Sequence, residues 1–267
     1  MIALVAGEGA LPAELARRLA ERGTPPVICE LAGHAPDVPP GLPRVRFRVE
    51  RMGGTIRRLR EMGVDRMCLA GAVRRPKVNP LRLDRATLPL LPRVMRAIRQ
   101  GDDGALREVI AILEERGIAV VGAHEILPDL LPPPGVPTRA APGAEAGAAA
   151  LAGEAAVAEM GARDQGQACV VAGGRVVARE GPDGTDAMLR TLGPEAAGGL
   201  LFKAPKPRQE RRADLPVIGP GTAEAAALAG LSGVVIEAEG VMVLDLGTTL
   251  AALDAAGLFL WVRERLA

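Results

Sequence analysis

The sequence predicts an α/β protein of two domains, on three observations. Short apolar runs alternate with amphipathic stretches through the first half of the 267 residues, a pattern typical of a parallel sheet covered by helices. A stiff segment, Pro132-Pro133-Pro134-Gly135-Val136-Pro137, follows. The second half has a different order of strands and helices. We therefore expect a Rossmann-like N-terminal domain over residues 1–130, a proline-rich linker over 131–143 and a mixed α/β domain over 144–267.

The elements of the first domain follow from local patterns. The segment up to Arg22 is expected to be a helix, because Leu11, Leu15 and Leu19 recur every four positions and Pro12 is tolerated in its first turn. Further helices are expected over residues 55–62, 90–99 and 103–116. Apolar runs predict strands over residues 2–6, 26–31, 44–49, 66–70 and 118–121.

The second domain opens with an alanine-rich helix over residues 144–161. Two apolar runs, 168–172 and 175–179, are joined by Gly173-Gly174 and predict a hairpin. The remaining pattern predicts strands over 200–203, 217–218, 234–237, 241–244 and 258–262, and helices over 186–192, 223–231 and 248–256.

Composition excludes several classes of protein. Thirty-three basic and 32 acidic residues give a net charge of +1, which argues against a nucleic-acid partner. The four aromatic residues are too few for modules that stack bases. The three cysteines form no CxxC pair, so neither a disulfide framework nor a zinc site is indicated. The chain begins in a strand and shows no signal peptide or membrane span, so we expect a cytoplasmic protein.

The first candidate site is Gly7-Glu8-Gly9-Ala10-Leu11-Pro12, a turn between a strand and a helix. Such turns bind anions or nucleotides, and Glu30 lies where a dinucleotide fold has its ribose-binding acid. However, Pro12 replaces the third glycine of that fingerprint, and Glu8 brings negative charge to the place of a pyrophosphate. We therefore favour contact with the ribose or base of a nucleotide, with a tight turn that needs glycine as the alternative.

Two acidic segments precede predicted helices. Asp102 and Asp103 form a carboxylate pair that is available to Mg²⁺ or to a ligand hydroxyl. Thr185 and Asp186, in Asp183-Gly184-Thr185-Asp186, are placed to hold a phosphate or a metal at a helix N-terminus. Helix caps and turns are the alternative interpretation of both segments.

The segment 203–216 is the most specific candidate. It contains Lys203 and Lys206, two of only three lysines in a chain whose basic residues are otherwise arginine. Prolines beside these lysines fix where the ammonium groups point, and Asp214 follows. Rigid cations beside a carboxylate suit the hydrolysis of a phosphoester, because cations neutralise phosphate oxygens while the carboxylate positions Mg²⁺ or the attacking water. A solvated charged loop is the alternative.

Two histidines complete the candidates. His124 follows the last strand of the first domain, and strand C-termini are where open α/β sheets bind ligands. It is therefore either at the edge of a site or a local hydrogen-bonding residue. His34 lies in a loop rich in proline and glycine and is expected to be solvated.

Together these motifs resemble the LpxI-type UDP-2,3-diacylglucosamine pyrophosphatases of lipid A biosynthesis. The matching segments run in order through nearly the whole chain: 7–12, 101–103, 122–124, 164–167, 183–189 and 203–216.

The resemblance implies a two-domain enzyme with its ligand between the domains. It would hydrolyse UDP-2,3-diacylglucosamine to 2,3-diacylglucosamine 1-phosphate and UMP with Mg²⁺. Asp214 matches the catalytic aspartate, with Lys203 and Lys206 as the cations and Asp214 and Asp186 as the metal ligands. The residues expected to bind substrate are Gly7, Glu8, Gly9, Ala10, Gly71, Asp102, Asp103, His124, Thr185, Asp186 and Gln209.

Partners and alternatives follow from the same reasoning. The amphipathic substrate implies transient peripheral contact with the inner membrane, and the resemblance suggests a homodimer. Two other functions stay open at this point. Gly7, Gly9 and Glu30 would suit an NAD(P)-dependent oxidoreductase, and the nucleotide-type turn would also suit a non-catalytic nucleotide-sugar-binding protein.

Overall fold

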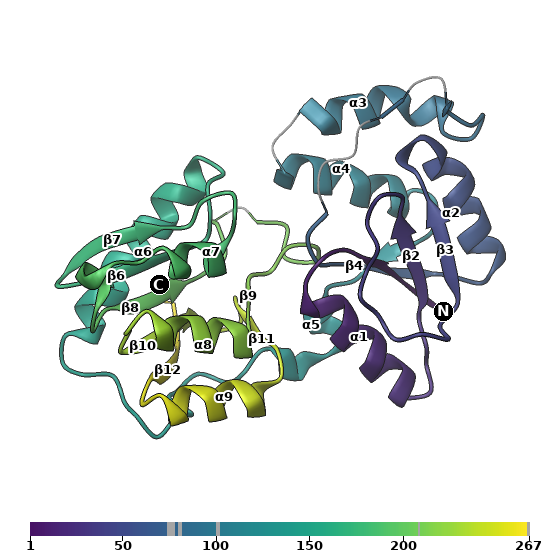
Figure 1. Ribbon diagram of the computed structural model, residues 1–267. Coiled ribbons are helices and arrows are strands. Elements are labelled where there is room, and N and C mark those ends of the chain that lie inside the picture. Colours follow the sequence, from purple (N-terminus) through teal and green to yellow (C-terminus); the bar gives the residue numbers. More distant parts are fainter. Residues whose placement is uncertain (74–77, 80–81, 100–101, 208, 266–267) are drawn as a thin grey trace. The chain divides into compact units, whose positions relative to one another are not determined.

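The computed structural model describes residues 1–73, 78–79, 82–99, 102–207 and 209–265, and for residues 97–99 and 102–103 it describes the backbone only. The chain folds into two compact units. Unit 1 comprises residues 1–128 and 210–214, and unit 2 comprises residues 129–209 and 215–267. Figure 1 shows the elements of each unit. Residues 210–214 thus make their contacts in unit 1, although they lie in the range that the sequence assigned to the second domain.

Unit 1 contains a five-stranded sheet whose order is β3-β2-β1-β4-β5 and whose strands are all parallel. This order matches five of the six strands in the Rossmann order 3-2-1-4-5-6, and it confirms the predicted fold class. The strands are β1 (Ile2–Ala6), β2 (Val27–Leu31), β3 (Arg44–Phe47), β4 (Arg66–Ala70) and β5 (Ala119–Val120). The helices are α1 (Ala10–Glu21), α2 (Met52–Glu61), α3 (Leu91–Arg99), α4 (Asp102–Glu114) and α5 (Ala123–Ile126).

Helix α2 begins three residues before the predicted start because of a tertiary contact. The sequence favours a start after Gly53 and Gly54, since glycine is a poor helix former. In the structure the backbone of Ala86 lies so close that a Cβ atom on Gly53 would be 2.3 Å from its carbonyl oxygen. The Gly53 amide donates to the Thr87 hydroxyl at 2.8 Å. Close packing and this hydrogen bond therefore override the local preference.

Unit 2 contains a mixed five-stranded sheet of order β12-β10-β8-β6-β7. Strands β8 (Leu200–Lys203), β10 (Gly233–Glu237) and β12 (Phe259–Arg263) are parallel, and β6 (Ala168–Ala172) is antiparallel to both β8 and β7 (Arg175–Arg179). The predicted hairpin between β6 and β7 is confirmed, with Gly173 and Gly174 at φ values of 54° and 73°. Both values suit a tight hairpin turn that favours glycine.

The other elements of unit 2 pack on this sheet or beside it. Strands β9 (Val217–Ile218) and β11 (Met242–Val243) form a separate two-stranded parallel sheet, so the segments on either side of residues 238–240 belong to different sheets. The helices are α6 (Ala146–Ala162), α7 (Thr185–Arg190), α8 (Pro220–Leu228) and α9 (Leu246–Ala255). Short 3-10 turns in the two units cover Val49–Arg51, Leu88–Leu90, Pro128–Leu130 and Pro194–Ala196.

Small residues let α6 approach the sheet closely. A Cβ atom on Gly153 would lie 2.5 Å from Cβ of Phe202, a buried residue of β8. The proline-rich linker also belongs to this unit, because Gly135 pairs with Val262 of β12 through two backbone hydrogen bonds of 2.9 Å. The linker is therefore fixed along β12 at this point.

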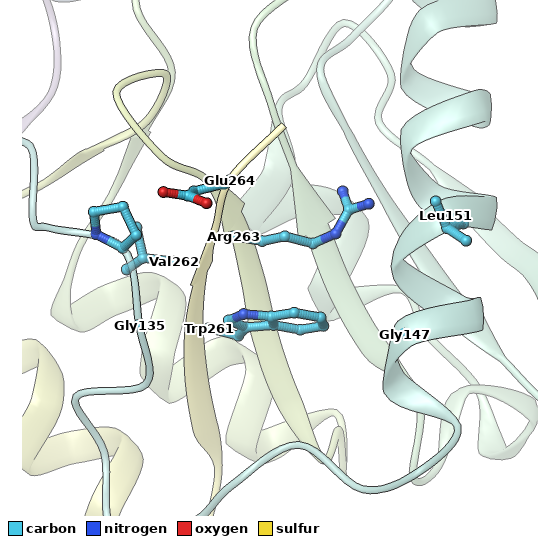
Figure 2. Close-up of a pocket in the computed structure, with 8 residues that line it drawn as sticks. Gly135, Gly147, Leu151, Trp261, Val262, Arg263 and Glu264 are labelled. Carbon is cyan, nitrogen blue, oxygen red and sulfur yellow. The ribbon is translucent and has the colours of Figure 1, made fainter. Parts of the chain in front are cut away.

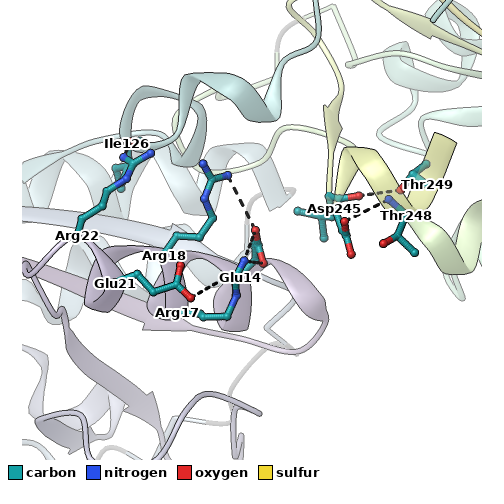
Figure 3. Close-up of polar contacts among 10 residues, drawn as sticks. Glu14, Arg17, Arg18, Glu21, Arg22, Ile126, Asp245, Thr248 and Thr249 are labelled. Atoms are coloured by element: carbon teal, nitrogen blue, oxygen red, sulfur yellow. Dashed lines mark hydrogen bonds and ion pairs between the residues drawn. The ribbon is translucent and has the colours of Figure 1, made fainter. Parts of the chain in front are cut away.

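Figure 3 shows local polar contacts at a helix start in unit 2 and along a helix in unit 1. In unit 2, Asp245 precedes α9 and accepts a hydrogen bond from the Thr248 amide at 3.3 Å, which caps the helix. In unit 1, Arg17 bridges Glu14 and Glu21 along the exposed face of α1. These contacts are local, and neither involves a candidate site residue.

Candidate active site

Lys203 is buried at the end of β8, with 5% of its surface exposed. Its Nζ atom donates to Oγ1 of Thr185 at 2.7 Å, and that hydroxyl donates to Glu180 at 2.6 Å. The other carboxylate oxygen of Glu180 accepts from the Gln167 amide at 2.6 Å. The structure therefore brings the predicted residues Lys203 and Thr185 together. Their series of hydrogen bonds ends at the carboxylate of Glu180, which was not among the predicted site residues.

Lys206 lies three residues later in a second polar cluster. Its Nζ atom is 2.8 Å from Oδ1 of Asp164, and its backbone amide donates to Gln209 at 2.7 Å. The Gln209 side chain is buried and donates to the side chain of Gln167 at 3.0 Å. Gln167 thus contacts both clusters, since its amide reaches Glu180 and its side chain reaches Gln209.

Two glycines hold the lysine segment in place. A Cβ atom on Gly161 would lie 2.7 Å from Cδ of Pro207, and one on Gly240 would lie 2.8 Å from Cδ of Pro205. The proline rings therefore pack directly on the backbone, where no larger residue fits without movement. This packing fixes the two proline rings against the backbone of unit 2.

Asp186 belongs to the same unit but is less tightly held. It is exposed in the first turn of α7, next to Thr185, and its Oδ1 atom is 3.5 Å from the hydroxyl oxygen of Thr222. Gly184 precedes the helix at a φ of 86°. Asp186 is therefore accessible to solvent and to a ligand.

The glycine turn after β1 packs against the turn after β4 in unit 1. The amides of Gly7 and Glu8 donate to the carbonyl oxygens of Ala70 and Ala72, both at 2.8 Å. A Cβ atom on Gly71 would lie 2.5 Å from the Glu8 carbonyl oxygen, and Gly71 has a φ of 82°. These backbone contacts supply a structural reason for Gly7 and Gly71. Gly9, at a φ of 100°, precedes the first turn of α1, which Ala10 begins.

Glu30, the acidic residue that a dinucleotide site would need, is already engaged by other side chains. Glu30 is buried in β2 and pairs with Arg44 and Arg46, the latter at 2.7 Å. The two guanidinium groups hold the pKa of this carboxyl below its ordinary value, with the hydrogen bond from Arg46 as the largest cause. Glu30 is therefore already occupied by two cations, whereas ribose binding needs an available carboxylate.

Asp214 lies at the end of the segment that joins unit 1. It is half-buried, and its amide donates to the Glu210 carbonyl oxygen at 3.0 Å. Arg212 fixes this turn, with Nε 2.9 Å from Glu210 and Nη1 2.7 Å from Glu114 of α4. Asp214 therefore stands on a turn that α4 anchors.

His124 lies in α5 of the same unit, with its ring close to the backbone of Gly122. Burial is the main cause that lowers the pKa of His124, with Glu125 acting in the opposite direction and Arg211 adding to the decrease. The imidazole therefore favours its neutral form. It is also influenced by the charge of Arg211, which lies in the segment that carries Asp214.

The predicted site residues thus fall into two groups within separate units. Unit 2 holds Lys203, Lys206, Thr185, Asp186 and Gln209, and unit 1 holds Gly7, Glu8, Gly9, Ala10, Gly71, His124 and Asp214. The side chains of Asp102 and Asp103 lie outside the described residues. The roles of Asp164, Arg212 and Glu114 could not be found in the sequence because they depend on contacts with distant segments. Glu180 lies five residues before its partner Thr185, but no local pattern marks that contact.

A cavity in unit 2, of about 590 Å³, lies between β12, α6 and the linker (Figure 2). Trp261 and Leu151 line it, and half of the Leu151 surface is exposed. Arg263 also lines it and pairs with Glu154 at 2.8 Å. Phe259, two residues before Trp261 on β12, is buried in the core of unit 2.

The described residues include no group of three or more His, Cys, Asp or Glu side chains that could hold a metal ion. Asp214 and Asp186 nevertheless fit Mg²⁺ as single carboxylate ligands, because this ion often binds through one or two carboxylates with water and substrate phosphates. Within the described ranges, no helix is long and apolar enough to cross a membrane.

Fold and site together define a two-unit α/β protein whose unit 2 carries two lysines suited to a phosphate, the buried Lys203 and the partly buried Lys206, which together form the lysine cluster. The chain matches the LpxI N-terminal domain family over residues 1–130 and the LpxI C-terminal domain family over residues 133–261. It is 39% identical to the UDP-2,3-diacylglucosamine pyrophosphatase LpxI of Caulobacter vibrioides over 267 residues, which cover 97% of this chain and 95% of that protein. The chain belongs to the LpxI family.

Proposed function

We propose that this chain is a UDP-2,3-diacylglucosamine pyrophosphatase. Water adds to one phosphorus of the diphosphate and the bridging P–O bond breaks, which gives 2,3-diacylglucosamine 1-phosphate and UMP in lipid A biosynthesis. The observation that carries this proposal is the match to both LpxI domains, together with the 39% identity to the Caulobacter enzyme along nearly its full length.

Lys203 and Lys206 act as the cations that bind the phosphate oxygens. Lys203 suits this role because its buried ammonium group is fixed by Thr185 before any ligand binds. A preorganised cation away from bulk water stabilises developing negative charge more strongly than a mobile one. Lys206 is held by Asp164, and Gln209 fixes its backbone.

Asp214 orients the attacking water and accepts its proton, from a turn that Arg212 holds on α4. Mg²⁺, held by Asp214 or Asp186 with the substrate phosphates, would supply charge neutralisation when bound. Asp102 and Asp103 are further carboxylates for a ligand hydroxyl.

Unit 1 contacts the nucleotide through the glycine turn. The amides of Gly7 and Glu8 are engaged with the backbone, so contact falls to Gly9 and Ala10 at the start of α1. With four aromatic residues in the chain, uracil is held by backbone and aliphatic groups. His124 provides a neutral imidazole near this unit's Asp214 segment.

The test is incubation of the purified protein with UDP-2,3-diacylglucosamine and Mg²⁺, followed by mass analysis of the products. We expect equal amounts of UMP and 2,3-diacylglucosamine 1-phosphate, and a loss of both in Asp214→Asn. Asp129→Asn is the control, since it changes a carboxylate outside the proposed site. Binding of UDP-sugar without UMP release would instead identify a non-catalytic binding protein. Reaction in H₂¹⁸O shows which phosphorus is attacked.

The protein works in the cytoplasm, contacts the inner membrane transiently to reach its amphipathic substrate, and forms a homodimer. The cavity face with Trp261 and the exposed Leu151 supplies apolar groups for contact with lipid. Co-sedimentation of wild type and Leu151→Asp with lipid vesicles tests the membrane contact, and analytical ultracentrifugation tests the dimer. Equal sedimentation of both proteins with vesicles would exclude that face.

A further inference from the structure

Unit 1 contains a cavity that the proposed reaction does not use. It has a volume of about 1060 Å³ and is lined by residues that follow β2, such as Gly33 and His34, and residues that follow β3, such as Arg48 and Arg51. It therefore opens at the carboxyl ends of two neighbouring parallel strands, which is where open α/β sheets bind ligands. The glycine turn after β1 is not part of its lining.

Positive charge dominates the wall of this cavity. Arg46, Arg48, Arg51 and Arg82 line it, and Glu30 is the carboxylate among the lining residues. Glu30 is already paired with Arg46 and with Arg44, which does not line the cavity. Among the described residues, the guanidinium groups of Arg48, Arg51 and Arg82 form no ion pair with a carboxylate.

A second buried carboxylate, Glu50, does not balance this charge. It accepts a hydrogen bond from the Asn79 amide at 2.8 Å. The hydrogen bond from the Asn79 amide is the main cause that lowers the pKa of Glu50, and the charges of Arg48 and Arg82 add a smaller decrease from a distance. Four arginines and one carboxylate therefore line the cavity, so its lining carries an excess of positive charge.

The other lining groups suit a ligand larger than a bare ion. Thr55 and His34 supply polar side chains, while Leu31, Phe47 and Leu83 supply apolar surface. Guanidinium groups bind phosphate oxygens in paired hydrogen bonds, and a cavity of this size accepts a small organic molecule.

We propose that this cavity is a second ligand site, which binds the phosphate group of a phosphorylated molecule through Arg48, Arg51 and Arg82. The phosphate belongs either to a free phosphate ester or to a lipid headgroup. This site lies wholly in unit 1 and does not depend on the lysine cluster of unit 2, so it stands independently of the proposed hydrolysis.

The test compares two double variants with the same change in charge. Arg48→Gln with Arg51→Gln removes two cavity arginines, whereas Arg57→Gln with Arg58→Gln removes two exposed arginines of α2 that do not line the cavity. Titration calorimetry with glycerol 3-phosphate probes a free phosphate ester. Co-sedimentation with phosphatidylcholine vesicles, with and without phosphatidylglycerol, probes a headgroup. We expect the cavity variant to bind the successful probe at least about tenfold more weakly than wild type and the control variant.

Amide shifts in NMR spectra locate the bound probe, and we expect them at Ala32, Gly33 and Thr55. Lys203→Met keeps this binding if the site is separate from the lysine cluster, even where it abolishes UMP release. Binding of glycerol 3-phosphate identifies a site for free phosphate esters, and binding of phosphatidylglycerol vesicles alone identifies a headgroup site. The proposal is overturned if wild type binds neither probe, or if both double variants lose binding equally.

Discussion

The ammonium nitrogen of Lys203 lies 2.7 Å from the hydroxyl oxygen of Thr185, and this buried contact joins the end of β8 to the first residue of α7. The same hydroxyl donates to Glu180, so its own hydrogen points away from the lysine. Thr185 therefore acts as an acceptor for Lys203 and fixes the direction of the ammonium group. The orientation of this cation is set by the fold.

Lys203→Met should lower kcat for UMP release about 10²- to 10³-fold, because it removes one preorganised donor to the developing charge. Lys203→Arg should not restore the rate, since the larger planar guanidinium cannot take the place of a buried ammonium group. Steady-state kinetics on both variants give the measurement, and circular dichroism verifies that they are folded. Wild-type turnover in Lys203→Met would remove this lysine from the reaction.

Thr185→Val should destabilise the protein by about 1–3 kcal/mol, because it leaves the buried ammonium group and the Glu180 carboxylate without their shared hydroxyl. Thr185→Ser keeps the hydroxyl and should recover most of the loss. Urea denaturation measures the free energy of unfolding. Thr191→Val is the control: it removes the hydroxyl of an exposed threonine, which donates to the Met188 carbonyl at 2.8 Å with no buried charge involved, and should cost less than Thr185→Val. A loss as large at Thr191 would contradict the assignment.

Gly71→Ala should destabilise the protein by about 1–3 kcal/mol more than Gly63→Ala. The two glycines have φ values of 82° and 84°, so both substitutions carry the same backbone strain. They differ in space, since a Cβ atom on Gly71 would lie 2.5 Å from the Glu8 carbonyl oxygen whereas Gly63 has nothing within 4 Å. Thermal unfolding of the pair isolates the contact between the two turns, and equal losses would show that this contact is unimportant.

The sequence predicted the fold well where the pattern is local. The limits of β1, β4, β6, β7, β8 and β9 agree with the predicted ranges to the residue, because each is a short apolar run bounded by turn residues. The pairing of β9 with β11 could not be predicted, since two-residue strands carry no periodic signal. The early start of α2 also depends on a contact with Ala86, far along the chain.

The candidate site, like the fold, could be predicted only where its pattern is local. The scarcity of lysine identified Lys203 and Lys206, and the helix-start pattern identified Thr185, so these residues could be found before any contact was known. Their partners could not, because Asp164 lies 42 residues from Lys206 and nothing local marks the contact. The position of the segment before Asp214 depends likewise on the contact of Arg212 with Glu114, which spans 98 residues.

Arg212→Gln should lower kcat about tenfold or more while changing stability by less than about 1 kcal/mol. The ion pairs of Arg212 are partly exposed, and such pairs contribute little to the free energy of unfolding. They do hold the turn that carries Asp214, and a small displacement of a reacting group lowers rates strongly. Kinetics and urea denaturation of Arg212→Gln and Arg212→Lys separate the two effects.

This prediction rests on the proposed role of Asp214. Arg18→Gln, which removes a partly buried arginine that is paired with Glu14 on α1, is the control and should keep the wild-type kcat. A change in KM alone in Arg212→Gln would place Arg212 in substrate binding instead of the positioning of Asp214.

His124 should make the protein less stable as the pH falls below about 6.5, the ordinary pKa of histidine. Burial lowers the pKa of His124 in the folded protein, so the unfolded chain takes up a proton that the folded protein resists. The stability linked to the neutral ring is therefore complete above the unfolded pKa and is lost as the pH falls through the folded pKa. Urea denaturation at a series of pH values between 5 and 8 measures the slope. His124→Gln should reduce this slope, whereas equal slopes in wild type and His124→Gln would show that the His124 ring ionises as readily in the folded state as in the unfolded chain.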